Sequence, residues 1–214
     1  MQMFRLERQR VFPAPGGHPC GLAWDGEALW CSDGRAEAIY RLDRELRPQY
    51  AIRCPTVRTG LAWDGEALWQ VAGRPAEVRR YRTTGELVDR RGLGPDGEFA
   101  CGMDIRDGTV YVAWRVLGHV TAQGVDTGEV TGTWTVASEP GGLACAPGEL
   151  FVADNAQGEI VRLDLTAGAA LRARVGGSPT GLAWDGELLW VNDYATATIS
   201  SYRVYGSQRE GGGR

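Results

Sequence analysis

The residues best suited to chemistry lie where five internal repeats of the chain differ from one another. Asp33, Asp154 and Asp193 share one repeat position, and His18 and Glu139 share another. Carboxylate oxygens are the ligands that Ca²⁺ and Mg²⁺ prefer, and a histidine beside them would admit Mn²⁺ or Zn²⁺. The three aspartates are therefore candidate ligands of a divalent metal. The alternative is that they only cap loop amides within the repeat.

Some of these residues also suit acid–base catalysis without a metal. Histidine titrates near neutral pH, and a neighbouring carboxylate can orient its ring. We therefore treat His18, Glu139 and Asp193 as catalytic candidates, with a solvent-exposed or loop-bracing His18 as the alternative. Cys20 and Cys101 share one more repeat position, so each is either a thiol that His18 could activate or a small core residue.

A second group of residues is cationic or aromatic. Such side chains can hold a small molecule through ion pairs with its anionic groups and stacking on its rings. The members are Arg58, Arg74, Phe99, Trp114, Arg115 and Tyr194. Apart from Tyr194 they lie in the second and third repeats, whereas the acidic residues lie in the fourth, fifth and first. The sequence therefore predicts a ligand site with one acidic wall and one cationic, aromatic wall.

The elements that position these residues follow from a repeat of about 40 residues. Gly21–Trp30 and Gly60–Trp69 are identical in sequence, and Gly181–Trp190 differs from them at one residue. Eroded copies begin at Gly102 and Gly142, so successive leading glycines are 39, 42, 40 and 39 residues apart. Each copy predicts four short antiparallel strands, with an Asp-Gly turn between the first two. Units of this length and content are typical of β-propeller blades.

The two ends of the chain predict how many blades there are. The fifth copy ends after its third strand, and an additional strand at 5–12 precedes the first copy. We therefore predict an all-β, five-bladed β-propeller of four-stranded antiparallel blades over residues 1–206, whose N-terminal strand completes the last blade. Residues 207–214 are expected to form a flexible tail. The repeated tryptophans are expected to pack between blades; they are Trp24, Trp30, Trp63, Trp69, Trp184 and Trp190.

The repeated Leu-Ala-Trp-Asp-Gly pattern, with Leu-Trp after it and an aspartate ending the second strand, resembles the NHL, YVTN and SMP-30-like propeller repeats. The SMP-30 resemblance implies a metal in the central channel. Five-bladed closure is similar to plant-type glutaminyl cyclases, and this implies active-site residues one and three positions before the leading glycine. Here those segments are His18-Pro19-Cys20-Gly21 and Phe99-Ala100-Cys101-Gly102. They lack the glutamine and glutamate of that family's Phe-Thr-Gln-Gly and Phe-Gly-Glu-Gly, so cyclase activity is not expected.

Composition narrows the classes of partner. The net charge is −4 with arginines spread along the chain, so we do not expect nucleic-acid binding. No apolar stretch is long enough for a membrane span or a signal core, which predicts a cytoplasmic protein with no membrane contact. We expect binding of a small, anionic or aromatic molecule at the top of the central channel, with lyase, isomerase or hydrolase chemistry. The alternative is a non-catalytic scaffold that binds a protein or peptide on its top face.

Overall fold

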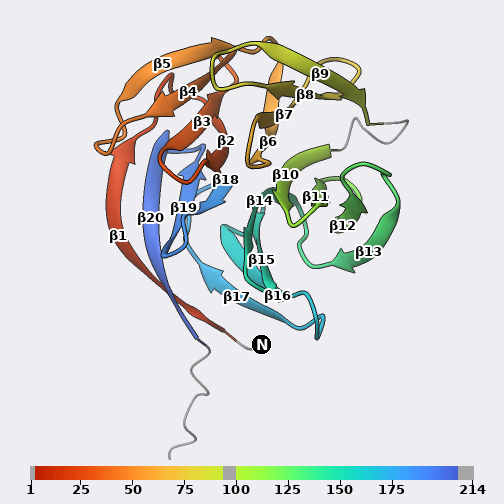
Figure 1. The fold of residues 1–214 in the computed structure, drawn as a ribbon. Helices are drawn as coiled ribbons and strands as arrows, with labels where there is room; N and C mark the ends of the chain where they lie inside the picture. The colour runs from red at the N-terminus through yellow and green to blue at the C-terminus, as the bar shows by residue number, and fades with distance from the viewer. Residues whose placement is uncertain (1–2, 94–99, 207–214) are drawn as a thin grey trace, which may run out of the picture.

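The computed structural model describes residues 3–93 and 100–206, which form five four-stranded antiparallel sheets arranged in a ring (Figure 1). Blade one consists of β2 (Pro19–Trp24), β3 (Leu29–Asp33), β4 (Ala38–Leu42) and β5 (Pro48–Arg53), and blade two of β6 (Val57–Trp63), β7 (Leu68–Ala72), β8 (Glu77–Tyr81) and β9 (Leu87–Gly92). Blade three consists of β10 (Ala100–Arg106), β11 (Thr109–Trp114), β12 (His119–Gly124) and β13 (Val130–Thr135). Blade four consists of β14 (Pro140–Ala146), β15 (Glu149–Asp154), β16 (Glu159–Asp164) and β17 (Ala170–Arg174). The predicted five-bladed propeller is confirmed. Within this described part of the chain, no helix has the length and apolar character needed to cross a membrane.

The fifth blade joins the two ends of the chain. It consists of β18 (Pro179–Trp184), β19 (Leu188–Asp193), β20 (Thr198–Tyr205) and the N-terminal strand β1 (Arg5–Pro13). β1 lies beside β20 (Figure 1) and pairs with it antiparallel. In this register Arg5 lies opposite Tyr205, and Pro13 lies opposite Thr198. The N-terminal strand therefore completes the last blade, as predicted. The tail predicted at 207–214 lies outside the described residues.

The repeated Asp-Gly turn is held by its aspartate. Asp25 Oδ1 accepts hydrogen bonds from the amides of Glu27 and Ala28 at 2.8 and 2.7 Å, and Oδ2 accepts one from Trp30 Nε1 at 2.7 Å. Short side chains that bind nearby amides stabilise turns of this kind. The same indole contact recurs in two other blades, from Trp69 to Asp64 and from Trp190 to Asp185. This explains why the aspartate and the second tryptophan recur together.

The leading glycines allow the inner strands of neighbouring blades to meet at the centre of the ring (Figure 1). A Cβ atom on Gly102 would overlap the carbonyl oxygen of Gly141, and one on Gly142 would overlap that of Thr180. Glycine is the residue that permits such a close approach of two backbones. A Cβ atom on Gly21 or Gly181 would lie 2.6 Å from the next inner strand, and one on Gly60 would lie 3.0 Å from it.

The repeated tryptophans pack in clusters between neighbouring blades, as predicted. Trp30 and Trp69 are buried members of two of these clusters. The others pack at cluster edges and are partly buried; they are Trp24, Trp63, Trp184 and Trp190. The indole rings therefore belong to the framework of the ring.

Candidate functional site

Strand topology separates the two faces of the ring. We call the face that carries the Asp-Gly turns the turn face. We call the opposite face, which carries the connections before each inner strand and the loops after each second strand, the loop face. Every site residue predicted from the sequence within the described ranges belongs to segments of the loop face or to the strand ends beside them.

Asp33 is buried and binds backbone amides of its own blade. Its Oδ2 accepts a hydrogen bond from the amide of His18 at 2.6 Å, and its Oδ1 accepts from Arg35 and Ala36 at 2.9 and 2.7 Å. Both carboxylate oxygens are therefore used to join the loop before β2 to the loop after β3. This arrangement fits the loop-capping alternative.

Asp154 has the same role in blade four. Ser138 donates its amide to Oδ2 and its hydroxyl to Oδ1, each at 2.9 Å. Arg172 Nη1 lies 3.5 Å from Oδ2. Burial acts to raise the pKa of Asp154, but the hydrogen bonds from Ser138 and from the amide of Glu139 outweigh it and hold the pKa below its usual value. Asp154 is thus an ionised structural carboxylate.

Asp193 is arranged differently from the other two aspartates. The amides of Ser178, Ala195 and Thr196 donate to it at 3.1, 2.8 and 3.3 Å, and all three bonds go to Oδ1. Within the described residues Oδ2 accepts no hydrogen bond, although Asp193 is only half-buried. Asp193 therefore braces its loop with one oxygen and retains a second oxygen that could accept a hydrogen bond from a ligand.

The three aspartates do not gather around a common point. Among residues 3–93 and 100–206, no group of three or more His, Cys, Asp or Glu side chains is arranged to hold a metal ion. Five of the six carboxylate oxygens already accept amide hydrogen bonds in three separate blades. The residues present therefore do not fit the metal site that the SMP-30 resemblance implies, and we assign no role to a metal.

A cleft of about 220 Å³ lies between blades four and five, and Asp193 is part of its wall. Its floor is the face of blade five that looks toward blade four, and the connection between β17 and β18 forms one side. Its polar lining residues are Arg8, Asp193, Thr196, Thr198, Ser200 and Tyr202. The cleft thus combines a carboxylate, a guanidinium and several hydroxyl groups in a space suited to a small molecule.

His18 contacts the residue that follows Asp193. Its ring centroid lies 4.7 Å from that of Tyr194 in an edge-on arrangement, which joins blades one and five on the loop face. Tyr194 is exposed, and the backbone of His18 is fixed by Asp33. The structure therefore brings the predicted site residues His18 and Tyr194 into contact, and Asp193 directly precedes Tyr194 in the sequence.

The acidic and cationic walls predicted from the sequence meet directly on the loop face. Arg115 Nη2 lies 3.3 Å from Glu139 Oε2 and donates a hydrogen bond to Asn155 Oδ1 at 3.1 Å. Asn155 Nδ2 in turn donates to the carbonyl of Pro179 at 3.3 Å. These contacts form a partly buried polar chain from blade three to blade five. Glu139 and Arg115 are paired with each other and not with His18.

Trp114 has a different environment from the one expected of a substrate-stacking ring. It is buried in the cluster between blades two and three, and its Nε1 donates to Thr121 Oγ1 at 2.9 Å. Trp114 ends β11, and its side chain lies on the face of the strand that packs into the core. Phe99, the other aromatic candidate of this region, lies outside the described residues.

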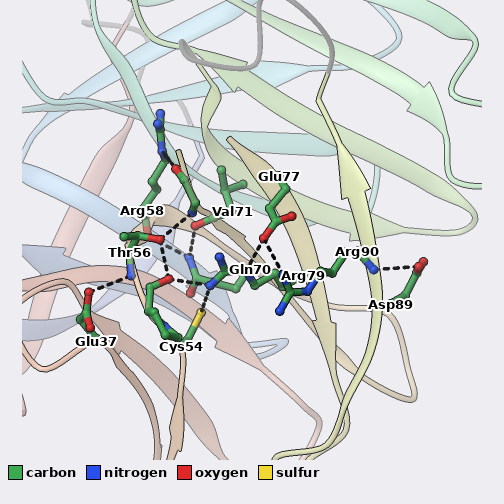
Figure 2. Close-up of polar contacts among 12 residues, drawn as sticks. Glu37, Cys54, Thr56, Arg58, Gln70, Val71, Glu77, Arg79, Asp89 and Arg90 are labelled. Atoms are coloured by element: carbon green, nitrogen blue, oxygen red, sulfur yellow. Dashed lines mark hydrogen bonds and ion pairs between the residues drawn. The ribbon is translucent and has the colours of Figure 1, made fainter. Parts of the chain in front are cut away.

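Arg58 and Arg74 both lie in blade two. Arg58 Nε donates to the carbonyl of Gly73 at 3.3 Å, and Gln70 Nε2 donates to the carbonyl of Arg58 at 2.8 Å (Figure 2). Arg74 follows Gly73 and is exposed. Both arginines therefore lie two or more blades from the cleft around Asp193.

The position directly before the leading glycine has a structural role. Cys101 Sγ donates to the carbonyl of Pro140 at 2.8 Å, and Thr180 Oγ1 donates to that of Pro19 at 3.3 Å, so each joins its blade to the next. Cys20 is also buried, and burial raises the pKa of Cys20 and of Cys101 to about 12. Thiols with such values are protonated at neutral pH, which favours the core alternative for both.

The sequence analysis missed Arg8 and the hydroxyl groups of β20. Both lie on outer strands, whereas the differences between the repeats point to loops and to the ends of second strands. A signal was present nonetheless, because Thr198, Ser200 and Tyr202 alternate along β20 and so share one face of the strand. Polar residues at every second position of a strand that faces another blade indicate a polar surface, and not an apolar core, between the two blades.

Comparisons with known proteins agree with this fold. No family model matches the chain, and the search of curated proteins found no match. Among solved structures, the glutaminyl cyclase of Myxococcus xanthus is similar over 95% of this chain and 97% of its own, with a TM-score of 0.77 and 15% identity. A catalytically inactive virginiamycin B lyase of Staphylococcus aureus with quinupristin is similar over 91% of this chain and 69% of its own, with a TM-score of 0.55 and 15% identity. A chain in the structure of a nidogen/laminin complex is similar over 88% of this chain and 83% of its own, with a TM-score of 0.63 and 17% identity. The chain is therefore a five-bladed β-propeller protein, and at these identities the likeness is one of fold alone.

Proposed function

We propose that the protein binds a small polar molecule in the cleft between blades four and five. The observation that carries this proposal is the arrangement of Asp193, whose Oδ1 is bound by three amides while Oδ2 has no partner among the described residues. A carboxylate that is held rigidly and lines a cleft of about 220 Å³ can accept a hydrogen bond from a ligand with little loss of side-chain entropy.

The charges of the cleft define the class of ligand. Arg8 on β1 supplies a guanidinium, which favours a carboxylate or phosphate group on the ligand. Asp193 requires a hydrogen-bond donor, such as a hydroxyl or an amino group, and the hydroxyls of Thr198 and Ser200 can bind either donors or acceptors. The cleft therefore suits a small molecule with both an anionic group and a hydroxyl or amino group.

Catalysis by this site would depend on proton transfer at Asp193. Lyase, isomerase and hydrolase reactions each need a group that removes or delivers a proton, and Asp193 Oδ2 is the available acceptor. The His18–Tyr194 pair lies next to it and could extend the site toward blade one. Some of the structural neighbours are lyases by name, the virginiamycin B lyase of Staphylococcus aureus among them, which supports this extension of the proposal.

The binding proposal can be tested with ligand-observed NMR. The panel would consist of hydroxy acids, amino acids and sugar acids, together with the neutral amide of each compound. We expect the acids to bind the wild-type protein and their amides to bind at least several-fold more weakly, because only the acids pair with Arg8. Arg8→Gln should abolish this preference. Arg203→Gln should leave it unchanged, because Arg203 is an exposed residue of β20 that pairs with Glu187 and does not line the cleft. Equal binding of acids and amides, or no binding by any compound, would refute the proposal.

A second candidate function is binding of a protein partner on the loop face. Val116 and Leu117 are 70% and 44% exposed and follow Arg115 directly. Adjacent exposed apolar residues favour a docking surface, and the nidogen/laminin neighbour is a propeller solved with a protein. Replacing both with serine should abolish retention of a partner in affinity purification, while leaving binding of the small-molecule panel unchanged.

A further inference from the structure

One residue of the inner strands departs from the repeat on the turn face. Two positions after the leading glycine, four blades carry alanine and blade three carries Asp104. The alanines are Ala23, Ala62, Ala144 and Ala183, and each packs in a cluster between blades. A carboxylate in this position must be desolvated in part, which is unfavourable unless something compensates its charge.

The residue facing Asp104 has changed as well. In the next blade Cys145 occupies the position that is tryptophan in blades one, two and five. Asp104 Oδ2 accepts the amide of Cys145 at 2.6 Å, and Oδ1 accepts the amide of Ile105 at 2.8 Å. The smaller cysteine thus makes room for the carboxylate and for open space beside it.

That space is a cavity of about 100 Å³ near the axis of the propeller. It is lined by the turn-face ends of inner strands from all five blades, with Asp104 and Cys145 on one side and Trp24, Trp63 and Trp184 around the rest. Asp104 and these three tryptophans are all half-buried. A ring of indoles around a carboxylate is an environment that attracts positive charge.

The neutral hydrogen bonds at Asp104 do not supply a counter-charge. Arg106, the cation nearest in sequence, also lines the cavity, and its charge acts to lower the pKa of Asp104. Its ion-pair contact, however, is with the exposed Asp107, whose Oδ2 lies 3.4 Å from Arg106 Nε. The remaining lining residues are uncharged. Within the described part of the chain, Asp104 accepts hydrogen bonds from two amides and has no cationic group in ion-pair contact. Its carboxylate can therefore pair with a cation that enters from the turn face.

We propose that this axial cavity binds a compact organic cation, with Asp104 as the counter-charge and the three tryptophans as aromatic walls. The indoles favour a methylated ammonium group over a small hydrated metal ion, because the former loses little hydration when it contacts aromatic rings. The cavity has room for such a headgroup and not for a large ligand. This site is separate from the cleft around Asp193, which opens between blades four and five.

Choline chloride is a suitable probe, and its neutral isostere 3,3-dimethylbutan-1-ol is the matched control. Binding can be measured at about pH 8 by calorimetry and by intrinsic tryptophan fluorescence, with sodium chloride added to equal ionic strength. We expect saturable choline binding with a change in tryptophan emission, and binding of the alcohol weaker by roughly tenfold because it lacks the charge.

Two variants test the role of the carboxylate. Asp104→Ala installs the residue of the other four blades, and Asp104→Asn retains an acceptor for the Cys145 amide, so at least one of the two should fold. Both should weaken choline binding by roughly tenfold or more, whereas Asp193→Asn should leave it unchanged. Unchanged affinity in a folded Asp104 variant, equal binding of choline and the alcohol, or no saturable binding to wild type would overturn the proposal. Loss of choline binding in Asp193→Asn would also overturn it, because the two sites would then not be separate.

Discussion

At the scale of single residues, identical side chains at one repeat position have different roles. Asp33 and Asp154 use both carboxylate oxygens to bind loop amides, whereas Asp193 uses one. The difference depends on which donors the neighbouring loop presents, and these donors are backbone amides. Because every residue except proline carries a backbone N–H, the sequence could predict that the aspartates share a position but not which of their oxygens would be occupied.

The raised pKa of Asp104 should make the free energy of unfolding depend on pH. Burial raises its pKa from 3.8 to about 6. The groups facing it are the Cys145 thiol on β14, Arg106 and Asp107 at the end of β10, and Tyr111 on β11. Since the folded-state pKa is raised, the contribution of Asp104 to stability is present below about pH 4 and is lost as the pH rises through about 6.

Asp104→Asn should therefore gain stability relative to wild type as the pH increases. Between about pH 4 and about pH 7.5 we expect the difference in unfolding free energy to move in favour of the variant by roughly 1–2 kcal/mol, after allowance for partial solvent screening. Urea unfolding at the two pH values measures this change. A difference that is the same at both values would show that the carboxylate is as well solvated in the folded state as in the unfolded chain.

At the scale of elements, the strands and turns could be predicted because their signals are local. The Asp-Gly turn and the tryptophan five residues after its aspartate form one hydrogen-bonded unit, and the unit is visible in the printed sequence. The placement of Trp114 could not be predicted in this way. Whether the last residue of a strand faces the mouth of the channel or the next blade depends on strand register and blade twist, which are properties of the assembled ring.

The leading glycines should be intolerant of any side chain. Gly102→Ala places a Cβ atom against the carbonyl of Gly141, so a backbone shift in one of the two inner strands is required. We expect a loss of about 2–4 kcal/mol in the free energy of unfolding. Gly92→Ala is the matched control, because a Cβ there has no neighbour within 4 Å among the described atoms. Equal stability of the two variants in urea would contradict the close packing at the centre.

At the scale of the whole molecule, the five blades share one architecture, and the proposed binding sites lie where the blades differ from one another. The number of blades and their closure by β1 could be predicted from the repeat and the chain ends. The cleft between blades four and five could not be predicted in this way, because it depends on how closely the facing side chains of the two blades pack in the assembled ring. Arg8 reaches that cleft only through the pairing of β1 with β20, a contact between the two ends of the sequence.

We propose that Asp193 binds the ligand, whereas Asp33 and Asp154 only brace their loops. The most direct test compares Asp33→Asn, Asp154→Asn and Asp193→Asn in one ligand-observed NMR experiment, with the best-binding acid of the panel and with melting temperatures measured in parallel. Each variant should lose roughly 1–2 kcal/mol of stability from weakened amide contacts, but only Asp193→Asn should lose ligand binding. Retained binding in a folded Asp193→Asn, or equal loss in all three folded variants, would contradict the claim.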